Sequence, residues 1–411
     1  MIFVKKIKIG CIGMGQRGSG MLRTIIKMFD NIEVCAICDL YEDRVSDNAE
    51  FVMKEKGYMP FKTMDATEVI NMKELDAIVI FTAWESHVDL AIKAMESGKY
   101  VGMEVGGAYS INDCYRLIDA YNRTGMPCML LENCCYGKTE LAVLNMVRQG
   151  LFGEIVHCSG GYQHELRAEI AGGIENRHYR LRNYLNRNCE NYPTHELGPI
   201  AKVLNINRGN RMLKLTSVAS KSRGLKTFVK ENADKYPHLI DADFKQGDIV
   251  TTVITCADGS TIVLTLDTTL PRAYTRGFTV RGTKGAYFED MDSVFLDDKD
   301  ADHFNPKKYW GNADEYKDKY KHDLWKKYES KAVEAGHDGM DYMVLAAFFE
   351  AVEKQVNTPI DVYDAATWMS ITALSEKSVS CGGMPVDIPD FTGGKWLLYK
   401  KEESELEFSL D

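Results

Sequence analysis

A glycine-rich turn between an apolar segment and a helical one constrains this chain more than any other feature of its sequence. Residues 7–13 (IKIGCIG) form an apolar run typical of a buried strand, and residues 19–29 have helical periodicity. Between them, GMGQRG fits the pattern GxGxxG, whose glycines let the backbone turn tightly and approach a pyrophosphate at the helix N-terminus. We therefore expect a dinucleotide to bind at Gly13, Met14, Gly15, Gln16, Arg17 and Gly18.

An acidic residue follows this turn at the spacing of a dinucleotide site. Asp39 ends the second apolar run, about 20 residues after Gly18. A carboxylate there bonds both ribose hydroxyls and repels a 2′-phosphate, so the sequence favours NAD over NADP as the cofactor. Arg44 could offset that repulsion, but we expect it to pair with a neighbouring carboxylate. The alternative is an ordinary glycine turn with an unrelated surface aspartate.

Strand and helix patterns alternate through the first 130 residues. Apolar runs at 32–39, 75–83, 99–105 and 127–133 are separated by amphipathic segments, the last of which should end at Gly125. Strands that alternate with helices of this length predict a parallel, doubly wound sheet.

Beyond the predicted parallel sheet, the segments become longer and rich in β-branched residues. Asp258-Gly259 between two alternating runs predicts a two-residue hairpin, and residues 283–285 predict a second turn. Residues 298–335 are charged and aromatic and are expected to form an inserted surface loop before two final helices. The predicted fold class is α/β, with an N-terminal Rossmann-type doubly wound parallel sheet (domain 1–133) and a C-terminal α+β domain (134–411) built on a largely antiparallel open sheet.

Composition argues against several classes of protein. The formal net charge of −10 argues against nucleic acid or an anionic membrane as the main partner, and the chain lacks an apolar run of about 18 residues that would predict a membrane span. The eleven cysteines have no metal-ligand spacing, and Cys35 and Cys38 lie in a strand, where positions three apart point to opposite faces. We expect a cytoplasmic protein with reduced thiols and no metal site.

Several longer segments resemble a known group of enzymes. The glycine turn, the TAWESH segment at 82–87 and the two-domain pattern are similar, over nearly the whole chain, to the glucose–fructose oxidoreductase / inositol dehydrogenase (Gfo/Idh/MocA) superfamily. More specifically, the chain resembles the NAD-dependent glycosidases of glycoside hydrolase family 109, whose characterised activity is α-N-acetylgalactosaminidase. The blocks concerned are 132–155 (ENCCYGKTELAVLNMVRQGLFGEI), 161–167 (GYQHELR), 191–212 (NYPTHELGPIAKVLNINRGNRM) and 336–342 (GHDGMDY).

This resemblance implies a reaction without net oxidation. A tightly held NAD oxidises the C3 hydroxyl of the sugar, which acidifies the C2 proton; the aglycone then leaves C1 by elimination, water adds, and C3 is reduced again. The protein has to supply orientation and acid–base groups. Two alternatives remain open: a sugar or polyol dehydrogenase of the same superfamily that releases NADH, and a non-catalytic NAD-bound sugar sensor.

The resemblance implies His195, Tyr162 and His164 as catalytic residues. His195 would accept the C3 hydroxyl proton and return it, since imidazole titrates near pH 7. The superfamily has an aspartate four residues before this histidine, but Asn191 stands there, which leaves a His–Asp relay in doubt. Tyr162 and His164 alternate along an extended segment and should share a face, with Tyr162 as the candidate base at C2 once a cation or imidazole lowers its pKa. Helix capping by His195 and sheet packing by Tyr162 are the structural alternatives.

The resemblance also implies which residues bind substrate and cofactor. Glu132 closes a strand at the carboxyl edge of the parallel sheet, where ligands of such folds bind. Arginine runs are more often solvated, so Arg180 is weighed against its neighbours Arg177 and Arg182. The expected substrate-binding residues are Glu132, Arg180, Tyr192, Tyr274 and His337. Besides the glycine turn, the expected cofactor-binding residues are Asp39, Trp84, His87 and Glu104, where Trp84 either stacks near the cofactor or packs in the core.

Two positions depart from the family pattern. Glu196 and Asp338 stand where the family commonly has glycine, and they either alter sugar specificity or are surface changes. The expected partners are a small-molecule glycoside and a second copy of the chain bound through the open sheet, with no nucleic acid and no membrane.

One residue that the superfamily would supply is missing. In YVGMEVGGAYS (100–110), no lysine follows Glu104, where a dehydrogenase of this kind usually has one for proton transfer. We expect the proton transfer to fall to His195 and Tyr162. The paired glycines at 106–107 are expected to leave room beside the nicotinamide for a sugar ring or a loop.

Overall fold

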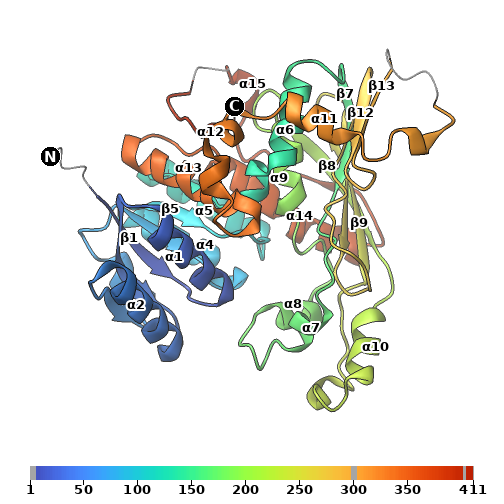
Figure 1. Cartoon of the computed structure of the whole chain (residues 1–411). Helices are drawn as coiled ribbons and strands as arrows, with labels where there is room; N and C mark the ends of the chain where they lie inside the picture. The colour runs from blue at the N-terminus through green and yellow to red at the C-terminus, as the bar shows by residue number, and fades with distance from the viewer. Residues whose placement is uncertain (1–5, 298–302, 401–403, 411) are drawn as a thin grey trace.

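The alternating strands and helices of the first 130 residues build a six-stranded parallel sheet (Figure 1). In the computed structural model, which describes residues 6–297, 303–400 and 404–410, the strand order is β3-β2-β1-β4-β5-β6. The strands are β1 (Ile7–Ile12), β2 (Ile32–Cys38), β3 (Phe61–Thr63), β4 (Ala77–Ile80), β5 (Tyr100–Met103) and β6 (Cys128–Leu130). All neighbouring pairs are parallel and the winding reverses beside β1, so the doubly wound sheet is confirmed.

Amphipathic helices cover this sheet. They are α1 (Gln16–Met28), α2 (Glu42–Lys56), α3 (Ala66–Ile70), α4 (Trp84–Glu96) and α5 (Ile111–Thr124). Local chemistry fixes their ends: Ser110 and Asp113 form a capping box at the start of α5, and Gly125 ends that helix at φ 68°, as predicted.

The second half of the chain builds an eight-stranded sheet of order β13-β12-β11-β7-β10-β9-β8-β14. Strands β7 and β10 are parallel, and the other neighbouring pairs are antiparallel, so the largely antiparallel sheet is confirmed. The strands are β7 (Ile155–Gly160), β8 (Met212–Ala219), β9 (Ile249–Cys256), β10 (Thr261–Asp267), β11 (Thr279–Gly282), β12 (Gly285–Phe288), β13 (Ser293–Leu296) and β14 (Val386–Asp387).

Both predicted turns occur, one of them longer than expected. Strands β9 and β10 form an antiparallel hairpin around Asp258-Gly259. The Cys256 amide donates to the Ser260 carbonyl (2.9 Å), which leaves three residues in the loop instead of two, with Gly259 at φ 90°. A glycine in the left-handed conformation permits this bulged loop. Thr283 and Lys284 join β11 and β12, as the sequence predicts.

Of the helices in the second half, α6, α9 and α14 lie between the two sheets (Figure 1). They are α6 (Lys138–Arg148), α7 (Arg167–Ala171), α8 (Arg180–Asn186), α9 (Thr194–Val203), α10 (Gly224–Glu231), α11 (Ala313–Lys319), α12 (Asp323–Ala332), α13 (Met340–Lys354), α14 (Val362–Ser380) and α15 (Lys395–Leu398). Among the described residues, no helix combines the length and the apolarity that crossing a membrane would require.

The expected surface loop over 298–335 is wrong for its described part. Residues 303–335 contain α11 and α12, and α12 buries Trp325, whose indole N–H donates to the Tyr136 carbonyl (2.9 Å). The segment forms short helices with one apolar side, and its many charged residues made this helical pattern hard to detect in the sequence. Residues 298–302 of the predicted loop lie outside the described residues, as do residues 1–5 at the start of the predicted first strand.

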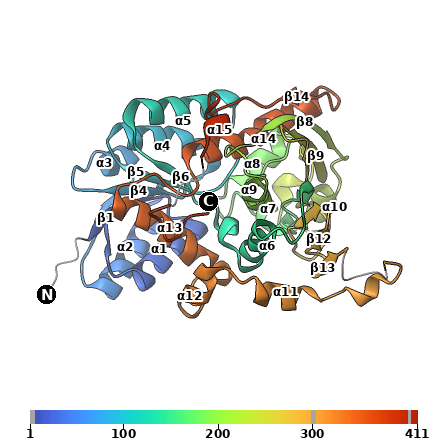
Figure 2. The ribbon, with the colours of Figure 1, turned by 90° about the horizontal axis from the view of Figure 1, so that it is seen from above.

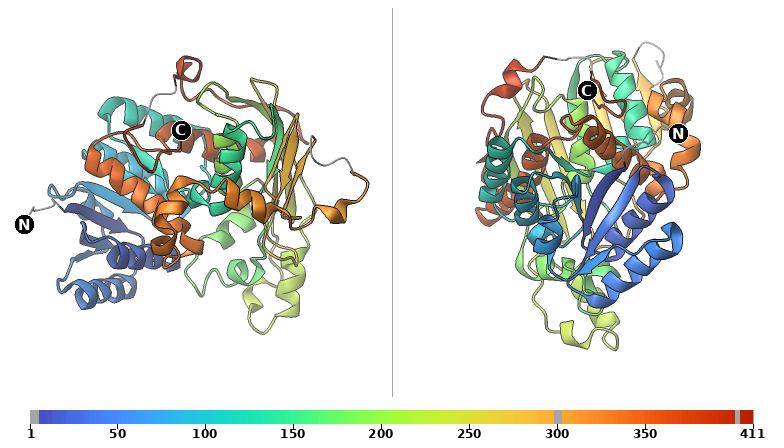
Figure 3. Two further views of the ribbon diagram at one scale, coloured as in Figure 1. Left: turned by 45° about the horizontal axis from the view of Figure 1, so that its top comes forward. Right: turned by 90° about the vertical axis from the view of Figure 1, so that its left-hand side faces the viewer.

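Two helices from the end of the chain join the two sheets. Helix α13 packs against α1 and β1, and α14 packs against α5 and β6 on one side and β8 on the other. Both helices are buried over most of their length. Figure 2 and Figure 3 show α13 beside the helices of the parallel sheet and α14 next to the antiparallel sheet. Helices more than 300 positions after its first strand therefore pack against the parallel sheet.

Each glycine of the GMGQRG turn serves a different purpose. Gly13 has φ 94°, and a Cβ on it would come within 2.6 Å of the Phe81 backbone. A Cβ on Gly18 would overlap the Gly13 carbonyl oxygen, because α1 starts directly against the strand. At Gly15 the nearest side chain, that of Arg44, would lie 3.5 Å from a Cβ. The first and third glycines serve the turn and the packing, and the second leaves room for a phosphate at the helix N-terminus.

The paired glycines after β5 are packed tightly, so the expected free space beside them is wrong. A Cβ on Gly106 would overlap the Trp84 indole, 2.7 Å from Nε1, and one on Gly107 would overlap Thr372 of α14. Both side chains are buried. The glycines let this loop pass between α4 and α14 more closely than any side chain permits.

We expect Gly106→Ala to lower the free energy of unfolding by about 1–3 kcal/mol, because the added Cβ displaces the Trp84 indole. Urea unfolding followed by tryptophan fluorescence measures the change. Gly20→Ala in α1 is the control: a Cβ there meets no described atom within 4 Å, and stability should rise by up to about 1 kcal/mol. Unchanged stability of Gly106→Ala would contradict the tight packing.

Candidate functional site

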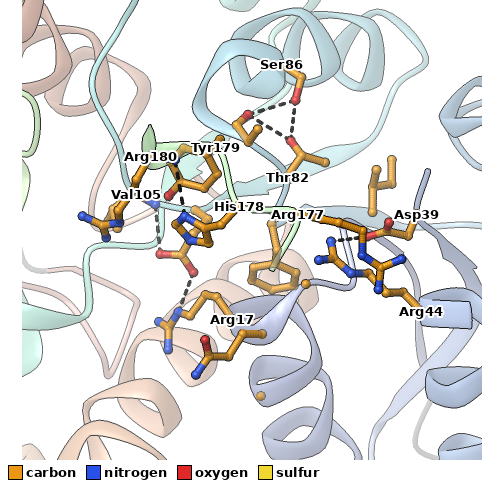
Figure 4. A pocket seen from close by; sticks show the side chains of 18 of the residues that line it. Arg17, Asp39, Arg44, Thr82, Ser86, Val105, Arg177, His178, Tyr179 and Arg180 are labelled. Atoms are coloured by element: carbon orange, nitrogen blue, oxygen red, sulfur yellow. Dashed lines mark hydrogen bonds and ion pairs between the residues drawn. The ribbon is translucent and has the colours of Figure 1, made fainter. Parts of the chain in front are cut away.

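One cavity brings the predicted cofactor turn and the predicted catalytic residues together. It has a volume of about 1110 Å³ and is lined by both halves of the chain. The glycine turn and the ends of β2 and β5 line it, together with residues from 162–164, 176–182, 192–195 and 336–341. Figure 4 shows Asp39, Arg44 and Arg177 at one end of the cavity, with Arg17, Val105 and Arg180 further along.

Asp39 is fixed beside the glycine turn. Its Oδ2 accepts the Met14 amide (2.6 Å), and its Oδ1 accepts the Tyr41 amide (3.0 Å). Arg44 Nη1 lies 3.9 Å from Oδ2, so the carboxylate with which Arg44 pairs is Asp39 itself. A carboxylate held next to the open Gly15 and the N-terminus of α1 fits the ribose and pyrophosphate of a dinucleotide.

The Arg17 guanidinium joins three parts of the chain. Its Nε donates to Glu104 Oε2 (2.9 Å), and Nη1 and Nη2 donate to the two carboxylate oxygens of Asp341 in α13 (2.7 and 2.9 Å). His337 Nδ1 lies 2.9 Å from Asp341 Oδ2, and Asn133 Nδ2 donates to Asp341 Oδ1 (2.9 Å). Burial raises the pKa of Asp341, but His337 and Arg17 outweigh burial, and the pKa lies well below its ordinary value.

This network of hydrogen bonds joins three residues that the sequence predicts for the site. Arg17 and Glu104 bond to each other, and His337 Nδ1 lies 3.2 Å from Arg17 Nη1, so His337 touches the cofactor turn as well as the cavity. Asp341 and Asn133 escaped prediction from the sequence. The four-residue spacing of His337 and Asp341 at the start of a helix was the signal that could have found the first of them.

Trp84 and His87 lie behind the cavity wall. His87 is buried with Nε2 2.9 Å from the Thr82 carbonyl oxygen, and burial lowers its pKa to about 4. The Trp84 ring packs on those of Tyr179 (4.7 Å between ring centres) and Tyr192 (5.5 Å). Both residues therefore pack behind the wall of the cavity, while Thr82 lines the cavity itself. For Trp84 this matches the alternative of packing in the core.

His195 begins α9 and is held by a buried carboxylate. Its Nδ1 lies 2.8 Å from Glu132 Oε1, which also accepts the Cys134 amide (3.1 Å). Burial raises the pKa of Glu132, but the charge of His195 and hydrogen bonds from His195 and the Cys134 amide outweigh burial, so the pKa lies below its ordinary value. An ionised carboxylate only accepts, so Nδ1 carries the hydrogen and Nε2 is the basic nitrogen of a side chain that lines the cavity.

Glu132 thus takes the place of the aspartate missing before His195. Asn191 instead donates to Gln246 Oε1 (3.2 Å). The sequence places Glu132 at substrate hydroxyls, but the carboxylate is fully buried and reaches His195. Ligand atoms of Glu132, Cys134 and His195 lie within 4.8 Å of one another, close enough for a metal. Because the carboxylate and imidazole already bond to each other and burial raises the pKa of the Cys134 thiol, we assign this group to hydrogen bonding.

Tyr162 and His164 share a face, as predicted, just beyond the end of β7. The Tyr162 hydroxyl lies 3.0 Å from His164 Nδ1, and the Arg180 guanidinium lies 5.6 Å from the centre of the Tyr162 ring. Burial raises the pKa of Tyr162 by more than Arg180 lowers it, so the expected fall in the phenol pKa is wrong. Burial and Arg180 lower the pKa of His164. Both groups are therefore neutral near pH 7.

Arg180 is the buried arginine of its segment. Its guanidinium lies over the rings of Trp84 (5.3 Å) and Tyr192 (5.0 Å), and its Nε pairs with Glu169 Oε1 (2.8 Å). A buried guanidinium that packs on aromatic rings and has one carboxylate partner is typical of a binding site. A run of solvated arginines lacks these contacts.

Two tyrosines flank the predicted catalytic residues. The Tyr192 ring centre lies 4.4 Å from that of Tyr162 and 4.7 Å from that of His195. Tyr274 is half exposed, with its ring centre 5.0 Å from that of His164. We call these rings the aromatic wall. Tyr162, His164, Tyr192 and His195 line the cavity, where their rings offer a surface to one face of a sugar, whereas Tyr274 contacts His164 and is not among the lining residues.

The two departures from the family pattern have different surroundings. Glu196, next to His195 in α9, is fully buried, with Oε2 3.4 Å from Arg276 Nε; Arg276 also pairs with Glu140. Glu196 is therefore not a surface change, and burial raises its pKa well above the ordinary value. Asp338 is exposed at φ 51°, a conformation that glycine adopts without strain.

The segment between α7 and α8 reaches across the cofactor end of the cavity. We call residues 172–179 the latch. Arg177 donates to both carboxylate oxygens of Asp43 in α2 (2.9 and 2.7 Å), and Arg44 donates to the Asn176 carbonyl (3.1 Å). These bonds cross from one half of the chain to the other. Figure 4 shows Arg44 and Arg177 close to Asp39.

Two protein families match consecutive parts of the chain. Residues 7–131 match the oxidoreductase family with the NAD-binding Rossmann fold, and residues 136–398 match the C-terminal domain of glycosyl hydrolase 109. The chain is 38% identical to an α-N-acetylgalactosaminidase of Tannerella forsythia over 95% of this chain and 87% of that protein, and 35% identical to one of Shewanella oneidensis over 95% and 86%. With the glycine turn, the first match assigns a nicotinamide cofactor to the cavity.

The fold also occurs among solved structures. An oxidoreductase from Agrobacterium radiobacter, in complex with NAD⁺, L-tartaric acid and magnesium, has a TM-score of 0.65 at 14% identity, covering 93% of this chain and 98% of that one. At this identity the likeness concerns the fold: a Rossmann-type domain followed by a second, open sheet.

Asp43→Asn is expected to speed the release of the nicotinamide cofactor by roughly two- to fivefold, since it removes an exposed ion pair of the latch. Displacement of the fluorescent reduced cofactor by excess oxidised cofactor measures the rate. The difference should shrink in about 1 M salt, which screens exposed charges. Glu42→Gln, which removes the neighbouring exposed carboxylate of α2, is the control and should leave the rate unchanged. Equal rates for Asp43→Asn and the wild type would contradict the latch.

Proposed function

This chain belongs to glycosyl hydrolase family 109, and from this premise we propose that it is an NAD-dependent glycosidase that acts on an α-N-acetylgalactosaminide. Transient oxidation at C3 would permit elimination of the aglycone across C1 and C2, followed by addition of water and reduction of C3. One observation carries the proposal. His195, held by the Glu132 carboxylate, and Tyr162 line the same cavity as the glycine turn. Val105, which also lines this cavity, stands where a dehydrogenase has its lysine. The names of the relatives support the choice of sugar.

NAD is the cofactor that Asp39 favours. Its carboxylate, beside the open Gly15, would bond the ribose hydroxyls and repel a 2′-phosphate. When bound, NAD takes a hydride from C3 of the sugar and returns it at the end of the turnover. Since the hydride returns, the cofactor does not have to leave between turnovers, which agrees with a latch across its end of the cavity. We place the cofactor-binding domain at 1–133 and the substrate-binding domain at 134–411.

His195 is proposed to handle the proton at C3. With its Nδ1–H bonded to Glu132, its Nε2 can accept the hydroxyl proton as the hydride leaves. The imidazolium that results lies 2.8 Å from a carboxylate, so Glu132 stabilises a charge that develops during the reaction. Nε2 returns the proton when C3 is reduced. Glu132 is thereby a positioning residue and does not bind the substrate hydroxyls.

Tyr162 is proposed as the base at C2. Arg180 lies beside its ring and favours negative charge on the phenol oxygen and on the enolate that forms next to it. The aromatic wall of Tyr192 and Tyr274 would orient the sugar. Val105 carries no group that exchanges a proton, which weakens the alternative of a sugar dehydrogenase.

Hydrolysis of p-nitrophenyl α-N-acetylgalactosaminide in D₂O tests the proposal. We expect release of nitrophenol without net accumulation of NADH at about 340 nm, and deuterium at C2 of the product. NADH formation over many turnovers without nitrophenol would instead establish a sugar dehydrogenase. If both signals are absent across a panel of glycosides, the result would support an NAD-bound sensor.

Glu132→Gln is expected to slow the first reduction of bound NAD by roughly 10²-fold. The amide still accepts Nδ1–H from His195 but no longer carries the charge that stabilises the imidazolium. Stopped-flow absorbance of bound NADH measures this rate. Glu196→Gln is the control, because it makes the same exchange at a buried carboxyl that pairs with Arg276 and is not among the residues that line the cavity, and its rate should stay within about threefold of the wild type. An equal loss in both variants would contradict the role of Glu132.

The open face of the antiparallel sheet supports self-association. A row of uncharged residues crosses this face in register from β8 to β12, and each member is partly or fully exposed: Thr216, Val253, Val263, Ser159, Thr279 and Phe288. The neighbouring strand positions Ile254, Ile262 and Val280 are buried toward the helices. We infer that a second copy of the chain covers the row, because a broad uncharged β surface favours burial.

Val253→Lys is expected to convert this assembly to monomers, since it places a charge in the middle of the uncharged row. Size-exclusion chromatography with light scattering measures the mass. Val333→Lys is the control: Val333 is exposed in the helical segment after α12, away from the sheet, and its replacement should leave the mass unchanged. A wild-type protein that is monomeric at micromolar concentration would refute the interface.

A further inference from the structure

A second proton acceptor lies directly behind the proposed base. Tyr162 can take a proton from C2 only if its own proton leaves, and that hydroxyl lies 3.0 Å from His164 Nδ1. Because burial raises the pKa of Tyr162, the phenolate is scarce near neutral pH. The elimination step therefore needs a route for the phenolic proton.

His164 has the properties of that acceptor. Burial and Arg180 lower its pKa, so its imidazole is neutral, and Nδ1 offers a lone pair to the Tyr162 hydroxyl. Glu169 and Glu165 are the nearby charges that favour the imidazolium once it forms. His164 lines the cavity and is only partly buried, so a proton on its ring can exchange with water.

His195 cannot serve this step. Its Nδ1 is bonded to Glu132 and is not available to the Tyr162 hydroxyl. After C3 is oxidised, Nε2 of His195 already holds the C3 proton. The protons from C3 and C2 must therefore go to different imidazoles.

Resting on the proposed function, we propose that His164 is the terminal proton acceptor of the elimination step and acts through Tyr162. The C2–H bond breaks as an O–H bond forms at the Tyr162 oxygen, while the phenolic proton passes to His164 Nδ1. The electron pair of the C2–H bond forms the C1–C2 double bond, and the aglycone leaves as an anion with the C1–O pair. Nothing is oxidised or reduced in this step. When the oxygen of water bonds to C1, His164 returns its proton through Tyr162 to C2, and the proton that the water loses neutralises the departed aglycone anion.

His164→Asn tests this step separately from C3 oxidation. The asparagine Oδ1 can still accept the Tyr162 hydroxyl, but an amide does not take its proton. With p-nitrophenyl α-N-acetylgalactosaminide, bound NADH should form at nearly the wild-type rate and accumulate to the concentration of enzyme. Nitrophenol release should fall by roughly 10²-fold.

Two further variants identify the relay. Tyr162→Phe should give the same accumulation of NADH, and the double variant should be no slower than the slower single variant, because the two residues act as one unit. His157→Asn is the control. It makes the same exchange in β7, at a histidine whose Nδ1 lies 2.9 Å from Thr261 Oγ1, and it should leave both signals unchanged.

Nitrophenol release by His164→Asn within about threefold of the wild type would overturn the relay and leave the glycosidase intact. Loss of NADH formation together with hydrolysis would also overturn it, because His164 would then serve C3 oxidation or the fold. Failure of the proposed function looks different. The wild type itself would reduce NAD over many turnovers without releasing nitrophenol, which would overturn both proposals.

Discussion

The bidentate ion pair between Arg17 and Asp341 holds together the two parts of the chain that form the cavity. Arg17 belongs to the glycine turn, and Asp341 lies 324 positions later, at the start of α13. Two parallel N–H···O bonds fix direction as well as distance, which apolar packing does not. Glu104, Asn133 and His337 bond to the same pair, so the ends of β5 and β6 and the start of α13 meet at the cofactor turn.

The electrostatics of the site separate its two sets of proton carriers. Glu132 stays ionised in a fully buried position because it faces His195, and it directs the basic nitrogen of that histidine to the cavity. Tyr162 and His164 are both neutral, and the Arg180 guanidinium lies beside the Tyr162 ring. The proposed redox-neutral turnover moves protons at two adjacent carbons, and the two proposed acceptors would keep those protons apart.

The sequence predicted well where the signal is local. The glycine turn, the alternating elements, the Gly125 helix end and the turn at Thr283 all depend on residues that are close in the chain, and the structure confirms them. Prediction failed where a second segment supplies the neighbour. The glycines at 106 and 107 are packed by Trp84 and Thr372, and Trp325 gives the segment after 303 a buried side.

By itself, the sequence determined both sheets, the place of the cofactor turn and the set of side chains available for acid–base chemistry, because periodicity and turn chemistry act over a few residues. Only the tertiary structure decided which of these side chains are partners. Glu132 lies 63 positions before His195 and was expected at the sugar, yet folding buries it against the imidazole. Burial likewise raises the pKa of Tyr162, which the neighbouring cation was expected to lower. Both outcomes follow from desolvation and contact between distant segments, and these arise when the second half of the chain packs against the first.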